Sequence, residues 1–363
     1  MPRLTLTPTL TLLLAPLTTA QFTPVTQFFN TTTFPHAQPA NVTHHLTTAL
    51  SLASTSGPLY TYFLSLCIAQ PVYPALFIPP SGFVAPFSPF SSLFFLGNSF
   101  VSSWAYDTGP AGGLVVIDAL SSPDEVDAVL LPGLAAFGYA GEDVKHVVLT
   151  HEHFDHYGGA RVLQERFGAA VYASARAWEG MEGLGPDAGL PAPPTRDRTL
   201  EDGQTLVVGD VAFEVVLTPG HTPGTLSLIF PVWEEGDEGA GSCADDGNGT
   251  VGGAKKGRGG RGTQHVAGLS GGTATPAGRA AREEKVRSQE RFAAIARERG
   301  VDVLLSNHHV ADGALWNADL LKYRAPGGPN PFVVGVDGFE RYIRINAVST
   351  RVIAAREGMG LDA

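Results

Sequence analysis

The chain contains very little cysteine: among its 363 residues only Cys67 and Cys243 are present. Two cysteines cannot build a zinc module that relies on several thiolates, so any metal ion would be held by histidine and carboxylate side chains. In an oxidising compartment the two cysteines could pair, but nothing in the sequence places them near each other.

Basic residues are also scarce. The 24 Lys and Arg residues stand against 35 Asp and Glu, which gives a net charge of −11. The one basic run, at 255–261, is interleaved with glycine. Binding a nucleic-acid backbone requires a clustered basic surface, so we expect no nucleic-acid partner.

Apolar runs long enough to cross a membrane are missing as well. A spanning helix needs ~20 apolar residues. The apolar run at 10–17 is too short, and the run at 59–78 is interrupted by Pro71 and Pro74, which a membrane helix tolerates poorly. The sequence therefore predicts no membrane span.

Residues 1–20 resemble an export signal. Arg3 supplies a positive start, the short apolar run follows, and small residues end the segment at Ala20. We therefore expect a secreted protein. It would carry N-glycosylation acceptor sites at three Asn-x-Ser/Thr triplets, namely Asn30, Asn41 and Asn248.

Three parts follow the expected signal. Residues 21–90 are rich in Thr, Pro and Phe and predict an irregular N-terminal extension. In 91–357, short apolar strands alternate with amphipathic helices, which is typical of a layered α/β sandwich. Within this domain, 234–262 is dominated by Gly with charged residues, and its composition predicts a disordered insertion.

Histidines gather where three of the predicted strands end. The segment 151–156 contains His151, His153, Asp155 and His156, the turn 218–224 contains His221, and a later strand ends at 306–309 with His308 and His309. Imidazole and carboxylate are zinc ligands when cysteine is absent. A lone His221 would be interpreted as a surface residue, but the closely spaced cluster favours a metal site.

These motifs resemble the metallo-β-lactamase superfamily, over about 93–312. The resemblance implies a four-layer αβ/βα sandwich with two zinc ions at one edge. It implies that His151, His153 and His221 hold the first zinc, and that Asp155, His156 and His308 hold the second, with His309 as the alternative to His308.

Many members of that family also supply an Asp that bridges the two metals. Here Asp237, Asp245 and Asp246 fall inside the Gly-rich insertion, and the following strand end, 269–273, carries no carboxylate. The chain in this respect resembles the β-lactamase branch that uses His at the second zinc.

The resulting functional prediction is a secreted zinc hydrolase that opens a cyclic amide or ester in a small-molecule substrate by a metal-bound hydroxide. Asp155 would act both as a ligand and as the carboxylate that orients the nucleophile. The alternatives are a thioester hydrolase of glyoxalase II type, an iron-dependent redox member of the same fold, and a non-catalytic binding protein. The sequence indicates no particular oligomeric state.

Several residues near these motifs permit two interpretations. Tyr157 could donate to an oxyanion, but packing on the following helix is the simpler role, and His265 is expected to be structural. The phenylalanines Phe77, Phe83, Phe87 and Phe90 could form an apolar lip over the site, although covering a sheet face is the more ordinary role.

Overall fold

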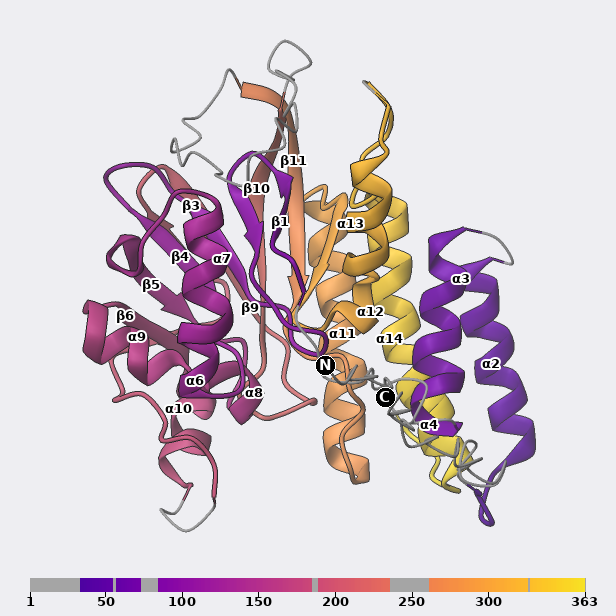
Figure 1. Cartoon of the computed structure of the whole chain (residues 1–363). Helices are drawn as coiled ribbons and strands as arrows, with labels where there is room; N and C mark the ends of the chain where they lie inside the picture. Colours follow the sequence, from indigo (N-terminus) through magenta and orange to yellow (C-terminus); the bar gives the residue numbers. More distant parts are fainter. Residues whose placement is uncertain are drawn as a thin grey trace, which may run out of the picture.

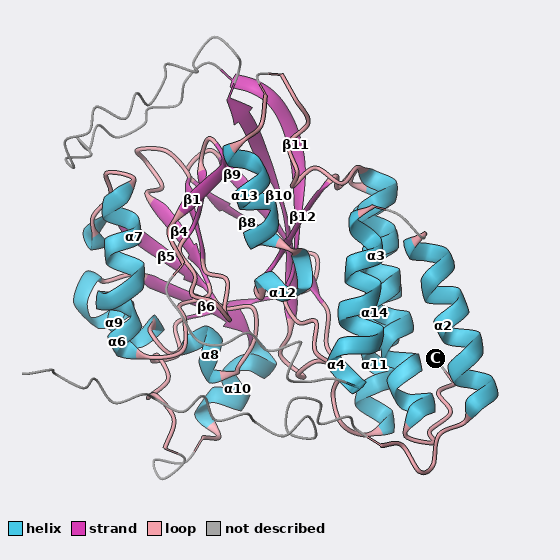
Figure 2. Ribbon diagram, turned by 45° about the vertical axis from the view of Figure 1, so that its right-hand side comes forward, coloured by secondary structure: helices cyan, strands magenta, loops and turns pink. Residues whose placement is uncertain are grey.

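Two β-sheets pack face to face, and helices cover the outer side of each sheet (Figure 1). The computed structural model describes residues 33–54, 57–72, 84–184, 189–235, 261–325 and 327–362. Its layers are helix, sheet, sheet and helix, as the view in Figure 2 also shows. The predicted four-layer αβ/βα sandwich is therefore confirmed.

The first sheet has seven strands in the order β1-β2-β3-β4-β5-β6-β7. Neighbours are antiparallel from β1 to β4 and parallel from β4 to β7. The central strand β4 is buried along its whole length, as expected for a strand covered on both faces. The strands are β1 (Phe87–Phe90), β2 (Leu93–Phe95), β3 (Trp104–Asp107), β4 (Leu114–Ile117), β5 (Val144–Val148), β6 (Ala170–Ser174) and β7 (Arg198–Leu200).

The second sheet has five strands in the order β12-β11-β10-β9-β8. All its neighbours are antiparallel except β11 and β12, which run parallel. Apolar side chains from both sheets meet between them and form one core. The strands are β8 (Thr205–Val208), β9 (Val211–Leu217), β10 (Leu226–Glu235), β11 (Arg261–Ser270) and β12 (Val303–Ser306).

Helices on the first sheet are short and connect its strands. Ser122 caps the first of them, because its hydroxyl accepts from the Glu125 backbone N–H at 3.3 Å. A second apolar cluster lies between these helices and the sheet. They are α6 (Pro123–Glu125), the π-helix η2 (Val126–Leu130), α7 (Leu131–Ala136), the 3₁₀-helix η3 (Gly141–Asp143), α8 (Phe154–Tyr157), α9 (Ala160–Phe167) and α10 (Ala175–Glu182).

Two long amphipathic helices, α11 and α14, cover the second sheet. Phe292 and Ile295 lie on the buried side of α11. Between the two long helices the chain forms two short ones. These helices are α11 (Arg279–Glu298), α12 (His309–Asp312), α13 (Ala314–Lys322) and α14 (Val336–Arg356).

The N-terminal extension is not irregular, so that expectation is wrong for the part that the structure describes. Helices occupy most of 39–72, and α2 packs against α14. Leu46, Ala49, Leu50 and Ala53 share one face of α2 at helical spacing. Threonines between them obscure the pattern, and packing overrides their low helix propensity. The helices are α2 (Pro39–Ala53), α3 (Pro58–Phe63), the π-helix η1 (Leu64–Ala69) and α4 (Gln70–Val72).

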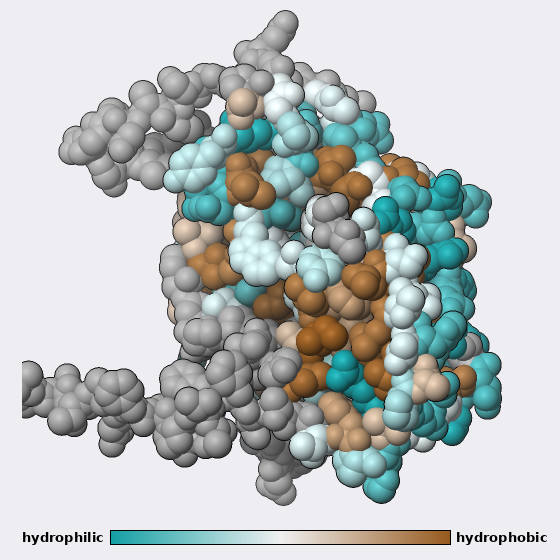
Figure 3. All heavy atoms as spheres, turned by 90° about the vertical axis from the view of Figure 1, so that its right-hand side faces the viewer, coloured by the Kyte–Doolittle hydropathy of each residue, from teal (hydrophilic) through white to brown (hydrophobic). Residues whose placement is uncertain are grey.

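These N-terminal helices leave apolar side chains on the surface. Leu64, at the start of η1, is 40% exposed. Figure 3 shows hydrophobic side chains gathering on the side of the molecule where these helices lie. Among the described residues, no helix combines the length and apolar character needed to cross a bilayer.

Two further expectations concern segment boundaries. The folded domain begins slightly before residue 91, since β1 starts at Phe87 and pairs with β2. The strands β10 and β11 pair with each other up to Glu235 and Arg261, so the two ends of the predicted insertion 234–262 belong to strands. The rest of the insertion, 236–260, and the predicted signal, 1–20, lie outside the described residues.

The strand ends that carry the histidines meet at one edge of the sandwich. β5 ends just before His151, β9 ends just before the turn with His221, and β12 ends just before His308. A hydrogen bond of 2.9 Å from the Trp104 indole N–H in β3 to the Ser306 carbonyl in β12 joins the two sheets there. The site is thus assembled from both sheets.

Candidate metal centre

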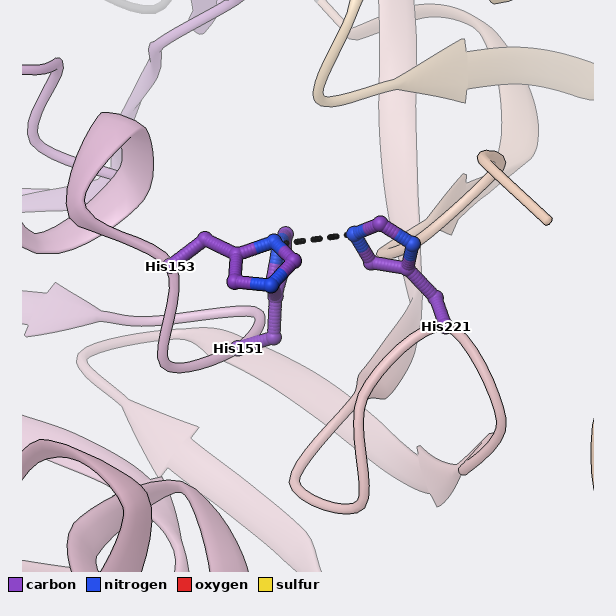
Figure 4. A group of neighbouring side chains, drawn as sticks. All are labelled: His151, His153 and His221. Carbon is purple, nitrogen blue, oxygen red and sulfur yellow. Dashed lines mark hydrogen bonds between the residues drawn. The ribbon is translucent and has the colours of Figure 1, made fainter. Parts of the chain in front are cut away.

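Three imidazoles converge at this edge from two different loops. We call His151, His153 and His221 the first group; their metal-competent nitrogens lie within 4.8 Å of one another. Figure 4 shows the three rings pointing toward one another, His151 and His153 from the loop after β5 and His221 from the turn after β9. His151 is buried, His221 is partly buried and His153 is exposed, so solvent reaches the group at His153.

The spacing of the nitrogens in the first group suits one small cation. His151 Nε2 lies 3.1 Å from His153 Nδ1 and 3.1 Å from His221 Nε2. Ligand atoms held at about 2.0–2.1 Å from one tetrahedral zinc ion lie about 3.3 Å from each other. The three residues therefore fit zinc in both chemistry and spacing.

Hydrogen bonds on the far side of two rings fix their orientation. His151 Nδ1–H donates to Thr150 Oγ1 at 3.1 Å, and His221 Nδ1–H donates to the Ala274 carbonyl at 3.0 Å. In each ring Nε2 is therefore left with its lone pair toward the group centre. Burial lowers the pKa of all three histidines, and the neighbouring imidazoles lower the pKa of His151 further. The group is thus neutral and ready to bind a cation.

A second set of ligand types lies beside the first. We call Asp155, His156 and His308 the second group; their donor atoms also lie within 4.8 Å of one another. His156 Nε2 lies 3.2 Å from His308 Nε2 and 3.4 Å from Asp155 Oδ2. Outer partners fix these rings too, because His308 Nδ1–H donates to the Phe100 carbonyl at 2.9 Å and His156 Nδ1–H donates to Asp118 Oδ2 at 2.7 Å.

The second group differs from the first in its charge. Burial favours a low pKa for His156, but the carboxylates of Asp155 and Asp118 outweigh it and raise this pKa to about 10. Burial would raise the pKa of Asp155, yet His156 and His308 hold it below its ordinary value. These carboxylates attract positive charge, which a proton or a metal ion can supply.

The structure separates the two candidates at the third strand end. His308 points into the second group, whereas the His309 ring turns away and its Nε2 contacts the Ser99 carbonyl. The predicted six ligands are therefore brought together in two sets of three, and His309 is not among them. That they bind metal remains a prediction.

The other residues that the sequence analysis names, where the structure describes them, lie outside the two groups. Tyr157 is fully buried in the core beneath the helices of the first sheet. His265 lies in β11, where its Nδ1 contacts Asp302 Oδ2 at 2.6 Å. Phe90 lies in the core between the sheets and Phe87 packs against it, while Phe77, Phe83 and Cys243 lie outside the described residues. Cys67 is buried and free.

Sequence reasoning missed one buried carboxylate that serves both groups. Asp118 accepts from the Thr150 backbone N–H at 2.7 Å, from the Thr150 hydroxyl at 2.8 Å and from His156. It thereby orients His156 directly and His151 through Thr150. Its position after the apolar strand β4, on the edge where β5 also ends, was the available signal.

Two further residues support the site in roles that the sequence did not indicate. Asn307 Nδ2 donates to Thr150 Oγ1 at 2.9 Å and to the Gly271 carbonyl at 2.6 Å, which joins the loops after β5, β11 and β12. Lys285 Nζ, buried in α11, donates at 2.9 Å to the same Ala274 carbonyl that holds His221. Burial lowers the pKa of Lys285 to about 7.

Comparison with known proteins gives matches of two kinds. The sequence profile of the Metallo-beta-lactamase superfamily matches residues 96–232. A hydroxyacylglutathione hydrolase of Mesorhizobium japonicum is 34% identical over 121 residues, which is 33% of this chain and 40% of that protein. One from Acidiphilium cryptum is 34% identical over 122 residues, 34% of this chain and 42% of that protein. The chain thus spans about two fifths of the length of these relatives.

Solved structures with the same fold extend over more of the chain. The native FEZ-1 metallo-β-lactamase of Legionella gormanii aligns with a TM-score of 0.61 and 18% identity, over 78% of this chain and 100% of that one. BJP-1, a subclass B3 metallo-β-lactamase of Bradyrhizobium japonicum, aligns with a TM-score of 0.56 and 20% identity, over 74% and 91%. These structures share the two-sheet fold, and the profile match over residues 96–232 shows that this part of the chain resembles the metallo-β-lactamase superfamily.

Proposed function

We propose that this chain is a zinc-dependent hydrolase that opens a cyclic amide or ester, a β-lactam-like ring first and a lactone second. The observation that carries the proposal is the convergence of two three-residue groups, in which neighbouring ligand atoms lie 3.1–3.6 Å apart. When bound, zinc supplies Lewis-acid polarisation of a carbonyl and makes hydroxide available near neutral pH.

The chain's own residues supply the remaining functions. The Asp155 carboxylate stays ionised at neutral pH, since His156 and His308 lower its pKa, so it can orient a water molecule and accept its proton. Its side chain is 13% exposed, which leaves it accessible from the site. Phe154, which is 42% exposed beside the exposed His153, offers an apolar contact for a bound substrate.

A thioester hydrolase is the second candidate, because the curated relatives are named hydroxyacylglutathione hydrolases. Against it, the described part of the chain shows no carboxylate that bridges the two groups. Among the described residues, Asp155 is the one carboxylate in either ligand group, and β11 ends at Ser270, followed by Gly271 and Gly272. The cyclic substrates therefore remain our first choice.

The decisive experiment measures metal content and activity on the same preparation of the full chain. A chromogenic cephalosporin, a lactone and an acylglutathione thioester should be compared with and without a chelator. We expect about two zinc ions per chain and chelator-sensitive opening of a cyclic substrate. Preference for the thioester would support the second candidate, iron would support a redox member, and inactivity at full zinc occupancy would refute a hydrolase.

We further propose that the chain is exported, on the strength of the signal-like segment 1–20. Asn41 is an exposed residue in the first turn of α2, so it is accessible for glycosylation, whereas Asn30 and Asn248 lie outside the described residues. Expression in a eukaryotic secretory host should yield a chain in the medium that has lost about 20 N-terminal residues. Retention of Met1 in an intracellular product would contradict export.

A further inference from the structure

Glu152 lies between two ligands of the first group in sequence, yet its side chain extends to the turn that carries the third ligand. Its Oε2 accepts from the Thr222 hydroxyl at 2.8 Å, and its Oε1 accepts from the Gly224 backbone N–H at 3.3 Å. Both partners belong to the turn that holds His221. We propose that Glu152 is a positioning residue, which locks the His221 turn onto the loop of His151 and His153.

The surroundings of Glu152 leave its side chain little freedom. A Cβ atom placed on Gly224 would lie 2.3 Å from Glu152 Oε2, and one placed on Gly180 of α10 would lie 2.7 Å from Glu152 Cγ. Only glycine at these positions lets the backbone approach so closely. The carboxylate is therefore held between α10 and the turn in a single orientation.

The hydrogen bonds around the carboxylate form a chain with one direction. The Thr222 backbone N–H donates to Thr225 Oγ1 at 3.0 Å, and the two threonine hydroxyls lie 2.9 Å apart. Since the Thr222 hydroxyl donates its one hydrogen to Glu152, the Thr225 hydroxyl donates to Thr222. The chain needs a pure acceptor at its end, and it needs two acceptor atoms because Gly224 also donates. A carboxylate meets both needs, whereas a carboxamide has a single acceptor atom and can accept from only one of the two donors.

The contact of Glu152 with the His221 turn joins the two loops that carry the first group. His151 and His153 follow a strand of the first sheet, and His221 follows a strand of the second, so the group depends on how the two sheets are aligned. A backbone hydrogen bond of 2.8 Å from Leu226 N–H to the Thr150 carbonyl already joins the loops at the strand ends. Glu152 adds a charge-assisted link at the turn itself, next to the ligand.

The inference rests on the proposed metal site, and its test uses metal affinity rather than activity. The variants are Glu152→Ala, Glu152→Gln, Thr222→Val and Thr222→Ser. The control is Glu179→Ala, which removes an exposed carboxylate of α10 that pairs with Arg176. Zinc affinity is measured by competition with a chromophoric chelator, and ligand geometry by the absorption spectrum of the Co²⁺-loaded protein.

Loss of a partner that orients a ligand typically weakens metal binding roughly 10–100-fold. We expect Glu152→Ala and Thr222→Val to weaken the tighter zinc site by that factor and to alter the Co²⁺ spectrum. Glu152→Gln should fall between Glu152→Ala and the unmodified chain. Thr222→Ser, which keeps the hydroxyl, should restore affinity, and Glu179→Ala should change nothing. In the double variant Glu152→Ala/Thr222→Val, the two losses should not add, because both break one contact.

The outcomes separate this inference from the proposed function. If the unmodified chain binds neither Zn²⁺ nor Co²⁺, both proposals are wrong. If it binds them and both Glu152 variants bind equally well with an unchanged Co²⁺ spectrum, only the positioning role is wrong. If Thr222→Ser loses as much affinity as Thr222→Val, the hydroxyl contact is likewise refuted. Far-UV circular dichroism identifies any unfolded variant, and Glu152→Gln and Thr222→Ser, the mildest changes, then decide the matter.

Discussion

The first and second groups lie side by side but differ in charge. The first group consists of three imidazoles whose pKa values are lowered, and neutral oxygens of Thr150 and Ala274 orient two of them. The second group contains Asp155, and the buried Asp118 stands behind His156. A cation entering the first group displaces no proton, whereas a cation entering the second competes with the proton that two carboxylates hold on His156. We therefore expect the first group to bind metal more readily.

The largest effect should come from breaking the first group. His153→Ala removes an exposed histidine of the first group, so the protein should fold while hydrolysis is abolished, a loss beyond the roughly 10–100-fold that an outer partner costs. The measurement is kcat/KM with zinc in excess, with thermal unfolding as the control for folding. Unchanged activity in a folded variant would rule out the proposed mechanism.

A smaller effect should follow from breaking the second group. His308→Ala leaves the first group intact, so zinc content should fall from about two ions to about one, with activity reduced but not lost. His309→Ala is the matched control, because its ring contacts the Ser99 carbonyl outside both groups. Metal analysis of the two variants decides between these adjacent residues. Loss of zinc in His309→Ala alone would show that the assignment is reversed.

The residues of both groups could be predicted from the sequence, because metal-competent side chains at strand ends form a local signal. The cluster 151–156 directly follows one apolar strand and the turn 218–224 with His221 follows another, so each motif can be recognised within a short segment. The supports are different. Asp118 lies 32 residues from Thr150, and Lys285 reaches Ala274 from another layer of the fold. The sequence shows that Asp118 follows an apolar strand, but its partners, like those of Lys285, are fixed by tertiary packing.

The N-terminal helices also depend on packing against a distant part of the chain. The stretch 39–53 contains three Thr residues, which disfavour helix. It is helical because one face of Leu and Ala side chains packs against α14, almost three hundred residues later in the chain. Propensity alone predicts loop there, and the partner that reverses the prediction is far away in sequence.

Asp118→Asn should weaken metal binding at the second group more than at the first. His156 Nδ1–H loses an ionised acceptor, whereas His151 is affected only through Thr150. We expect roughly 10–100-fold weaker binding of the second metal and a smaller change at the first. Stepwise zinc titration by calorimetry measures both affinities. Equal weakening of the two steps would show that Asp118 supports the site as a whole rather than mainly the second group.

The smallest expected effect concerns Asp312, which supports the strand end before His308. Its carboxylate accepts from the Ser306 backbone N–H at 2.7 Å and from the Ala314 backbone N–H at 2.9 Å. Burial raises its pKa to about 7, well above its ordinary value. The neighbouring phenols of Tyr62 and Tyr342 have raised pKa values, so they stay neutral across pH 5–8.

The stability of the fold should decrease as the pH rises, because the folded chain binds the Asp312 proton more tightly than the unfolded chain does. Between about pH 4 and 7 the folded chain keeps the Asp312 proton and the unfolded chain releases it, so rising pH favours unfolding. The stabilising contribution is complete below about pH 4 and is lost as the pH rises through 7, at up to about 1.4 kcal/mol per pH unit. Asp312→Asn cannot titrate, so any constant cost of the amide leaves the slope unaffected. Urea unfolding of the metal-free protein at pH 5, 6, 7 and 8 should therefore show a flatter profile for Asp312→Asn. Parallel profiles would mean that Asp312 is ionised in the folded chain, held by its two backbone donors in spite of burial.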